Sequence, residues 1–65
     1  MENNLFLYRR KAKMRQLDLA LKLGTSEQTI SNLETGRTMV SLDKAIAIGR
    51  ILQIDPKEIF PSVFK

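Results

Sequence analysis

The stretch over residues 15–37 constrains the fold most strongly, because it combines two short helical patterns with a tight turn between them. Within the first pattern, over residues 16–23, one helix face carries an apolar stripe of Leu19, Ala20 and Leu23. The stripe stops at Gly24, and a residue without a β-carbon readily ends a helix in the left-handed conformation. A second helix is therefore expected to begin within about three residues of the first one's end.

The second helix of this pair, over residues 27–34, has one apolar and one polar face. Its N-cap is predicted at Ser26, because Glu27 then lies in the first turn, where the helix dipole favours a negative charge. Ile30 and Leu33 form the apolar face when each residue advances by about 100°. The opposite face carries Glu27, Gln28, Ser31 and Asn32. Such side chains can read base edges in a DNA major groove, and a solvated outer face is the alternative interpretation.

The segment QLDLALKLGTSEQTISNLETGR resembles the helix-turn-helix of the lambda-repressor/Cro family, also called the xenobiotic-response-element family of regulators. The matching residues are Gln16, Leu19, Ala20, Gly24, Ile30, Glu34 and Gly36. With its flanking helices the resemblance covers roughly residues 3–60. It implies an all-α, compact five-helix domain over residues 1–65, with the helix-turn-helix at about 16–34 and a short tail at 61–65.

The resemblance also implies which residues contact the sugar-phosphate backbone of DNA. Family members grip a phosphate with a glutamine that opens the second helix, and this role carries over to Gln16 with help from Arg15. In this family the second helix of the pair, here residues 27–34, is the recognition helix that reads bases. The loop after it implies contacts from Arg37 and Thr38 to the DNA backbone, and we add Ser26 at the start of that helix. A purely structural role at the helix N-terminus is the alternative for Gln16. Glu27 likewise has the alternative of serving only as a favourable first-turn residue.

Arg9 is the charged residue that most needs a partner. It lies on or beside the inward stripe of a first helix predicted over residues 3–13, with Asn3 or Asn4 as its cap. That stripe consists of Leu5, Tyr8 and Ala12. The resemblance implies an ion pair between Arg9 and Glu34, which would join the first helix to the recognition helix. A phosphate contact by Arg9 is the competing interpretation.

Two further helices are predicted in the C-terminal third of the chain. The fourth runs over residues 42–52 with Ser41 as N-cap, and the fifth begins after Asp55 and ends before Pro61. The core face of the fourth helix is expected to comprise Leu42, Ala45, Ile46, Gly49 and Leu52. A second apolar strip and the tail suggest a dimer interface of Ile48, Ile51, Phe60, Val63 and Phe64.

Leu17 and Leu21 depart from the family pattern, which usually has polar residues at both positions. They lie one helical turn apart and are expected to face outward. Scattered apolar surface and a patch for a partner protein are both open as explanations.

Composition excludes several classes of protein. The 65 residues include neither cysteine nor histidine, so disulfides, thiolate or imidazole metal sites and histidine-based triads are excluded. No nucleophile-base pair or carboxylate cluster suggests an enzyme, and no metal, cofactor or small-molecule ligand is expected. The longest apolar run, over residues 45–49, is far shorter than a membrane span, and the N-terminus lacks the pattern of a signal peptide. We therefore expect a cytoplasmic protein without a membrane role.

The net charge of +4 is concentrated near the N-terminus. Over residues 9–22 only Asp18 opposes the cations Arg9, Arg10, Lys11, Lys13, Arg15 and Lys22. Such a cluster suits a polyanion when it lies beside a helix of groove-reading size, whereas a solvated face is the alternative. We expect a sequence-specific, double-stranded DNA-binding regulator of prokaryotic or phage type, a repressor that binds a near-palindromic operator as a homodimer. A protein-interaction module, such as an antitoxin or phage anti-regulator, is the alternative.

Overall fold

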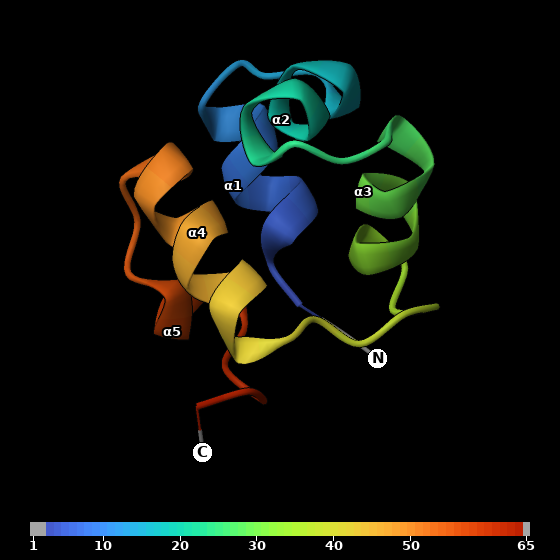
Figure 1. Ribbon diagram of the computed structural model, residues 1–65. Coiled ribbons are helices and arrows are strands. Elements are labelled where there is room, and N and C mark those ends of the chain that lie inside the picture. Colours follow the sequence, from blue (N-terminus) through green and yellow to red (C-terminus); the bar gives the residue numbers. More distant parts are fainter. Residues whose placement is uncertain (1–2, 65) are drawn as a thin grey trace.

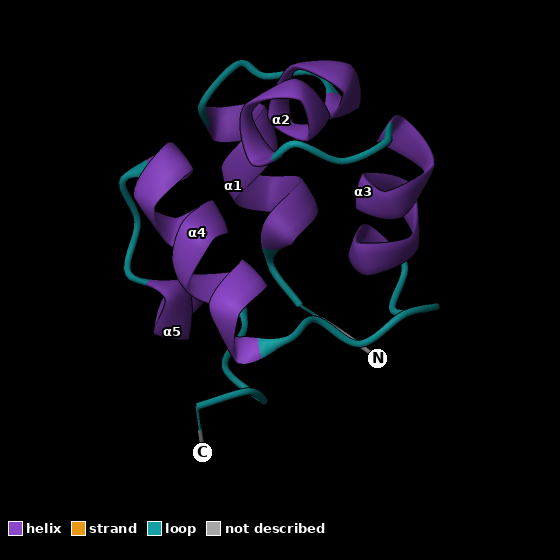
Figure 2. Ribbon diagram, in the orientation of Figure 1, coloured by secondary structure: helices purple, strands orange, loops and turns teal. Residues whose placement is uncertain are grey.

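The computed structural model describes residues 3–64, which form a compact bundle of helices joined by loops, without strands (Figures 1 and 2). The helices are α1 (Leu5–Lys11), α2 (Gln16–Leu23), α3 (Glu27–Glu34), α4 (Leu42–Leu52) and α5 (Pro56–Ile59). This confirms the prediction of an all-α, five-helix fold. The bounds of α2, α3 and α4 are those predicted from the sequence. None of the helices within residues 3–64 is long and apolar enough to cross a membrane.

Helix α1 is shorter at both ends than the predicted range of residues 3–13. At its start the backbone of Asn4 is the N-cap, while the side chain of Asn3 accepts a hydrogen bond from the Leu5 amide at 2.9 Å. At its end the left-handed backbone of Lys13, with φ of 59°, prevents the helix from continuing.

The predicted caps of the remaining helices are present. Gly24 ends α2 with φ of 78°, and the Ser26 hydroxyl accepts a hydrogen bond from the Thr29 amide at the start of α3. Ser41 and Asp55 cap α4 and α5 through their side-chain oxygens. These local signals fix where each helix begins or ends because each satisfies backbone groups that the helix leaves unpaired.

The core lies between all of the helices. Its fully or nearly fully buried apolar residues are Leu5, Leu19, Ala20, Ile30, Leu33, Ala45, Ile48, Leu52, Ile59 and Phe60. The predicted inward position of Ala12 is wrong, because Ala12 follows the last residue of α1 and is exposed.

The predicted core face of α4 is also partly wrong. Leu42 and Ile46 are 52% and 37% exposed, whereas Ala45, Ile48 and Gly49 are buried. Two overlapping stripes at helical spacing exist on this helix, and periodicity alone could not distinguish between them. The packing of α2 and α5 against α4 buries a face that consists of Ala45, Ile48, Gly49 and Leu52.

The expected dimer interface needs a correction as well. Ile48 and Phe60 are 0% and 1% exposed within one protomer, so neither offers a surface to a second copy. Ile51, Val63 and Phe64 are half-buried and pack against the core from its edge. The tail forms a turn in which the Val63 amide donates to the Phe60 carbonyl at 3.0 Å.

Two hydrogen bonds connect the N-terminal segment to elements that are distant in the sequence. The Asn3 side-chain amide donates to the Leu33 carbonyl at 2.8 Å, near the end of α3, and the Asn4 backbone amide donates to the Ile59 carbonyl at 2.8 Å. The N-terminal segment thus joins the end of α3 to α5. The chain that follows α4 passes close to Gly49, where a β-carbon would lie only 2.8 Å from the Ile54 carbonyl oxygen.

Candidate nucleic-acid interface

The polar face of α3 presents its side chains as one connected surface. Glu27 and Gln28 are exposed, and Ser31 and Asn32 are half-buried one turn later. The Gln28 side-chain amide donates to the Asn32 side-chain carbonyl at 3.0 Å, which aligns two amide groups along the helix. The structure therefore places the predicted base-reading residues on one side of one helix.

Helix α3 is anchored at both ends by local hydrogen bonds. At its start the Ser26 hydroxyl accepts from the Thr29 amide at 3.1 Å and lies 2.9 Å from the Thr29 hydroxyl. At its end the Thr35 hydroxyl donates to the carbonyl of Ser31 at 3.0 Å. These bonds satisfy terminal backbone groups and keep the short helix from fraying.

Arg37 and Thr38 follow α3 in a loop that folds back onto the helix. Both backbone amides donate to the Asn32 carbonyl, at 3.0 and 3.3 Å, and Gly36 makes the reversal with φ of 76°. Both side chains are exposed. The loop thereby holds two predicted phosphate contacts in a fixed position relative to the polar face of α3.

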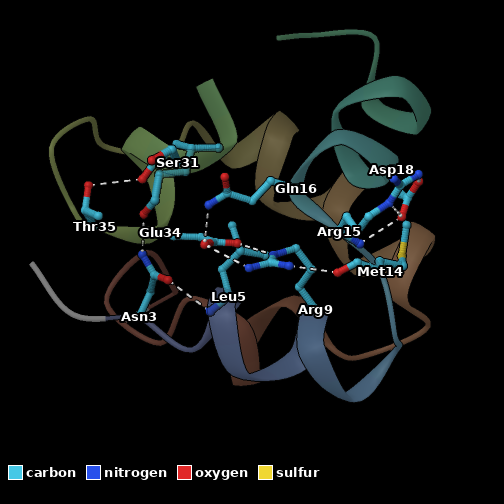
Figure 3. Close-up of polar contacts among 11 residues, drawn as sticks. Asn3, Leu5, Arg9, Met14, Arg15, Gln16, Asp18, Ser31, Glu34 and Thr35 are labelled. Carbon is cyan, nitrogen blue, oxygen red and sulfur yellow. Dashed lines mark hydrogen bonds and ion pairs between the residues drawn. The ribbon is translucent and has the colours of Figure 1, made fainter. Parts of the chain in front are cut away.

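A buried polar network joins α1, α2 and α3 behind this surface (Figure 3). The Arg9 guanidinium forms the predicted ion pair with Glu34, and each side chain is about 5% exposed. Arg9 Nη2 also donates to Glu34 Oε1 at 3.3 Å, while Arg9 Nη1 donates to the Met14 carbonyl at 2.7 Å. The Gln16 side-chain amide donates to Glu34 Oε1 at 3.0 Å.

This network includes two connections that sequence reasoning missed. For Gln16 the sequence predicts a phosphate contact, with a purely structural role at the helix N-terminus as the alternative, and it predicts no partner for Met14. The bond from Gln16 to Glu34 spans 18 residues and the bond from Arg9 ends on a backbone carbonyl. Neither leaves a signal in local spacing, because any backbone carbonyl could accept from Arg9 and because Gln16 and Glu34 lie 18 positions apart.

Arg15 occupies the N-cap of α2 and is held by Asp18. Its Nε and Nη2 atoms donate to the two carboxylate oxygens at 3.0 and 2.9 Å, and its backbone amide donates to the same carboxylate at 2.8 Å. These hydrogen bonds lower the pKa of Asp18 from 3.8 to about 2, the Arg15 side-chain bonds having the largest effect. The Arg15 side chain is nevertheless 77% exposed, so its outer nitrogen atoms face solvent.

The spacing of Arg15 and Asp18 was a signal that could have identified this pair. A residue at the N-cap followed by an acid three positions later is the pattern of a capping box, in which the acid accepts from the N-cap amide. The unusual feature is that an arginine fills the N-cap position, where a hydroxyl or carboxyl side chain is more common.

Two short helices joined by a tight turn, the second with a polar outer face and an apolar inner face, constitute a helix-turn-helix. A model of the helix-turn-helix family, of the Cro/C1 type, matches residues 5–59, and the chain belongs to this family. The chain is similar to an uncharacterised HTH-type transcriptional regulator from Methanocaldococcus jannaschii. The two are 40% identical over 60 residues, which cover 92% of this chain and 91% of the relative. The resemblance inferred from the sequence is confirmed.

Proposed function

We propose that the protein is a transcriptional regulator that binds double-stranded DNA in a sequence-specific manner. The observation that carries this proposal is the polar face of α3, whose four predicted base-reading side chains share one side of a capped helix. Membership of the helix-turn-helix family and the name of the similar archaeal regulator support it. The net charge of +4 suits a polyanionic partner.

Gln28 and Asn32 are the central candidates for base reading. Each side-chain amide has a donor and an acceptor, the combination that pairs bidentately with the major-groove edge of adenine. Their mutual hydrogen bond at 3.0 Å fixes the orientation of both amides before DNA arrives. We infer that Ser31 and Glu27 contact neighbouring bases, Glu27 as an acceptor for a cytosine amino group.

Gln16 is the central candidate for a phosphate contact. Its amide nitrogen carries two hydrogen atoms, of which one is donated to Glu34. The second is available for a phosphate oxygen at the N-terminus of α2, where the helix dipole favours an anion. In this role Glu34 orients the amide of Gln16. Arg15, Ser26, Arg37 and Thr38 provide the other backbone contacts in our proposal.

We further propose that the protein acts as a homodimeric repressor in the cytoplasm. Two recognition helices in successive major grooves would lie about 34 Å apart and would read a near-palindromic operator. The half-buried Ile51, Val63 and Phe64 support an interface at α4 and the tail, to which the exposed Leu42 and Ile46 add apolar surface. Occupancy of an operator blocks access by other proteins, which makes repression the outcome we propose.

One observation favours a second candidate function. Leu17 and Leu21 are 41% and 70% exposed on the outer side of α2, as the sequence predicted. Exposed leucines one turn apart are suited to helix-in-groove contacts with another protein. A protein-interaction module, such as an antitoxin or phage anti-regulator, would use this patch.

Selection of bound duplexes from a random pool tests the leading proposal. We expect enrichment of an inverted repeat with half-sites about ten base pairs apart. The variant Gln28→Ala should relax the preference at one position of each half-site, by about 1–3 kcal/mol in discrimination, with an unchanged salt dependence. Leu21→Ser is the matched control and should enrich the wild-type sequence. Failure of the wild-type protein to enrich any sequence would contradict sequence-specific binding and favour the interaction module.

A further inference from the structure

An open cleft of about 380 Å³ lies between the end of α1 and the start of α2. Its polar lining includes Arg10, Lys13, Arg15 and Gln16, together with Glu27, the first residue of α3. The cleft therefore connects the proposed phosphate contacts at the start of α2 with the first residue of α3, and it adds Arg10 and Lys13 to them.

The cleft has an excess of positive charge. Within residues 3–64 the ion pairs are Arg9 with Glu34 and Arg15 with Asp18, so neither Arg10 nor Lys13 has an acidic partner there. Both of these cations are exposed. The Arg10 guanidinium lies 5.4 Å from the centre of the Phe6 ring, a contact that restrains its position. Glu27 is the one acid among the residues that line the cleft, against the cations Arg10, Lys13 and Arg15.

Lys13 has an unfavourable backbone conformation for a residue with a side chain. Its φ of 59° is left-handed, and its amide and that of Met14 donate to the Arg10 and Arg9 carbonyls at 2.9 and 3.1 Å. A left-handed position at the end of a helix is most often occupied by glycine. Gln53 has the same φ of 59° at the end of α4 but does not line the cleft. Lys13 and Gln53 therefore share the same backbone strain, but of the two only Lys13 lines the cationic cleft.

We propose that this cleft binds a phosphate of the DNA backbone, with Lys13 and Arg10 as its ligands. The proposal rests on the proposed DNA-binding function and extends the phosphate contacts of Arg15 and Gln16 beyond the groove that α3 reads. A helix in the major groove is bordered by the sugar-phosphate backbone, and a cationic cleft beside its first turn faces that backbone. A phosphate contact by the Lys13 ammonium group explains why a lysine stands at a left-handed position where glycine would be less strained.

Three variants separate charge from backbone strain. Lys13→Gly removes both the charge and the strain, Gln53→Gly removes the same strain away from the cleft, and Lys57→Ala removes an exposed lysine of α5 that does not line the cleft. Binding is measured across a range of salt concentrations to a duplex of roughly 21 base pairs that carries the enriched site. Thermal unfolding of each variant is measured in parallel.

We expect Lys13→Gly and Gln53→Gly to raise Tm by about 5 °C each, because each removes the steric strain of a β-carbon in the left-handed backbone conformation. Only Lys13→Gly should weaken DNA binding, roughly three- to tenfold, with a slope of log K against log salt that is shallower by about 0.9. Arg10→Gln should reproduce this change in slope.

The controls show which proposal fails if these results are not obtained. If the wild-type protein binds with a steep salt dependence and Lys13→Gly has the same affinity and slope as Lys57→Ala, the phosphate cleft is overturned while the proposed function stands. If the wild-type protein itself binds the duplex without salt dependence or does not bind it, the proposed function fails, and the cleft proposal fails with it.

Discussion

The α1–α3 junction and the α4–α5 junction are held together by different physical means. At the first, a buried arginine and a buried glutamate pair across helices and engage Gln16, a side chain that we assign to DNA. At the second, the absence of a side chain on Gly49 lets Pro56 approach closely. Hydrogen bonds and an ion pair fix the orientation of α1 and α3 at the candidate interface. At the α4–α5 junction, close packing of backbone and side-chain atoms fixes the distance between the two helices.

The largest expected effect comes from breaking the polar junction with Glu34→Gln. This substitution leaves the charge of Arg9 buried without a counter-ion, which should cost about 3–5 kcal/mol of the free energy of unfolding. Chemical denaturation at neutral pH measures this loss. The effect is large because domains of this size have a total stability of only about 3–10 kcal/mol.

Glu58→Gln is the matched control for this prediction. The Glu58 carboxylate accepts a hydrogen bond from the Tyr8 hydroxyl at 3.1 Å in an exposed position, so its loss should change stability by less than about 1 kcal/mol. Equal effects of the two substitutions would show that burial of the Arg9–Glu34 pair is unimportant.

The steric junction should respond to Gly49→Ala with a smaller loss. Alanine normally stabilises a helix relative to glycine by about 1 kcal/mol. At this position the added β-carbon would lie 2.8 Å from the Ile54 carbonyl oxygen and 2.9 Å from Pro56 Cδ. We expect net destabilisation of about 1–3 kcal/mol, measured by thermal unfolding. A rise in Tm would show that α5 moves away freely and that the close approach is not a constraint.

The smallest effect on stability is expected for the exposed ion pair of Arg15 and Asp18, in contrast to the buried pair of Arg9 and Glu34. Because the folded-state pKa of Asp18 is lowered to about 2, its charge contributes stability above its ordinary pKa, and this contribution disappears as the pH falls toward 2. NMR titration should give a pKa of about 2 for Asp18 and a value closer to 3.8 in Arg15→Gln. An unchanged Asp18 pKa in that variant would assign the shift to a cause other than Arg15.

Much of the fold followed from local signals in the sequence. Gly24, Ser26, Ser41 and Asp55 set helix ends because glycine conformation and side-chain caps act over a few neighbouring residues. The polar face of α3 and the outward position of Leu21 followed from helical periodicity for the same reason. The ion pair between Arg9 and Glu34 required the family resemblance, because no local rule connects residues 25 positions apart.

Tertiary packing decided the features that local patterns left ambiguous. It selected which apolar stripe of α4 is buried, placed Ile48 and Phe60 in the core and left Leu42 exposed. It also brought the Gln16 amide to Glu34 and gathered Arg10 and Lys13 around one cleft. The sequence alone determined the helices and their polar and apolar faces, because those depend on short-range backbone chemistry. The selection among faces and the partners of buried polar groups depend on how separate helices fill one core.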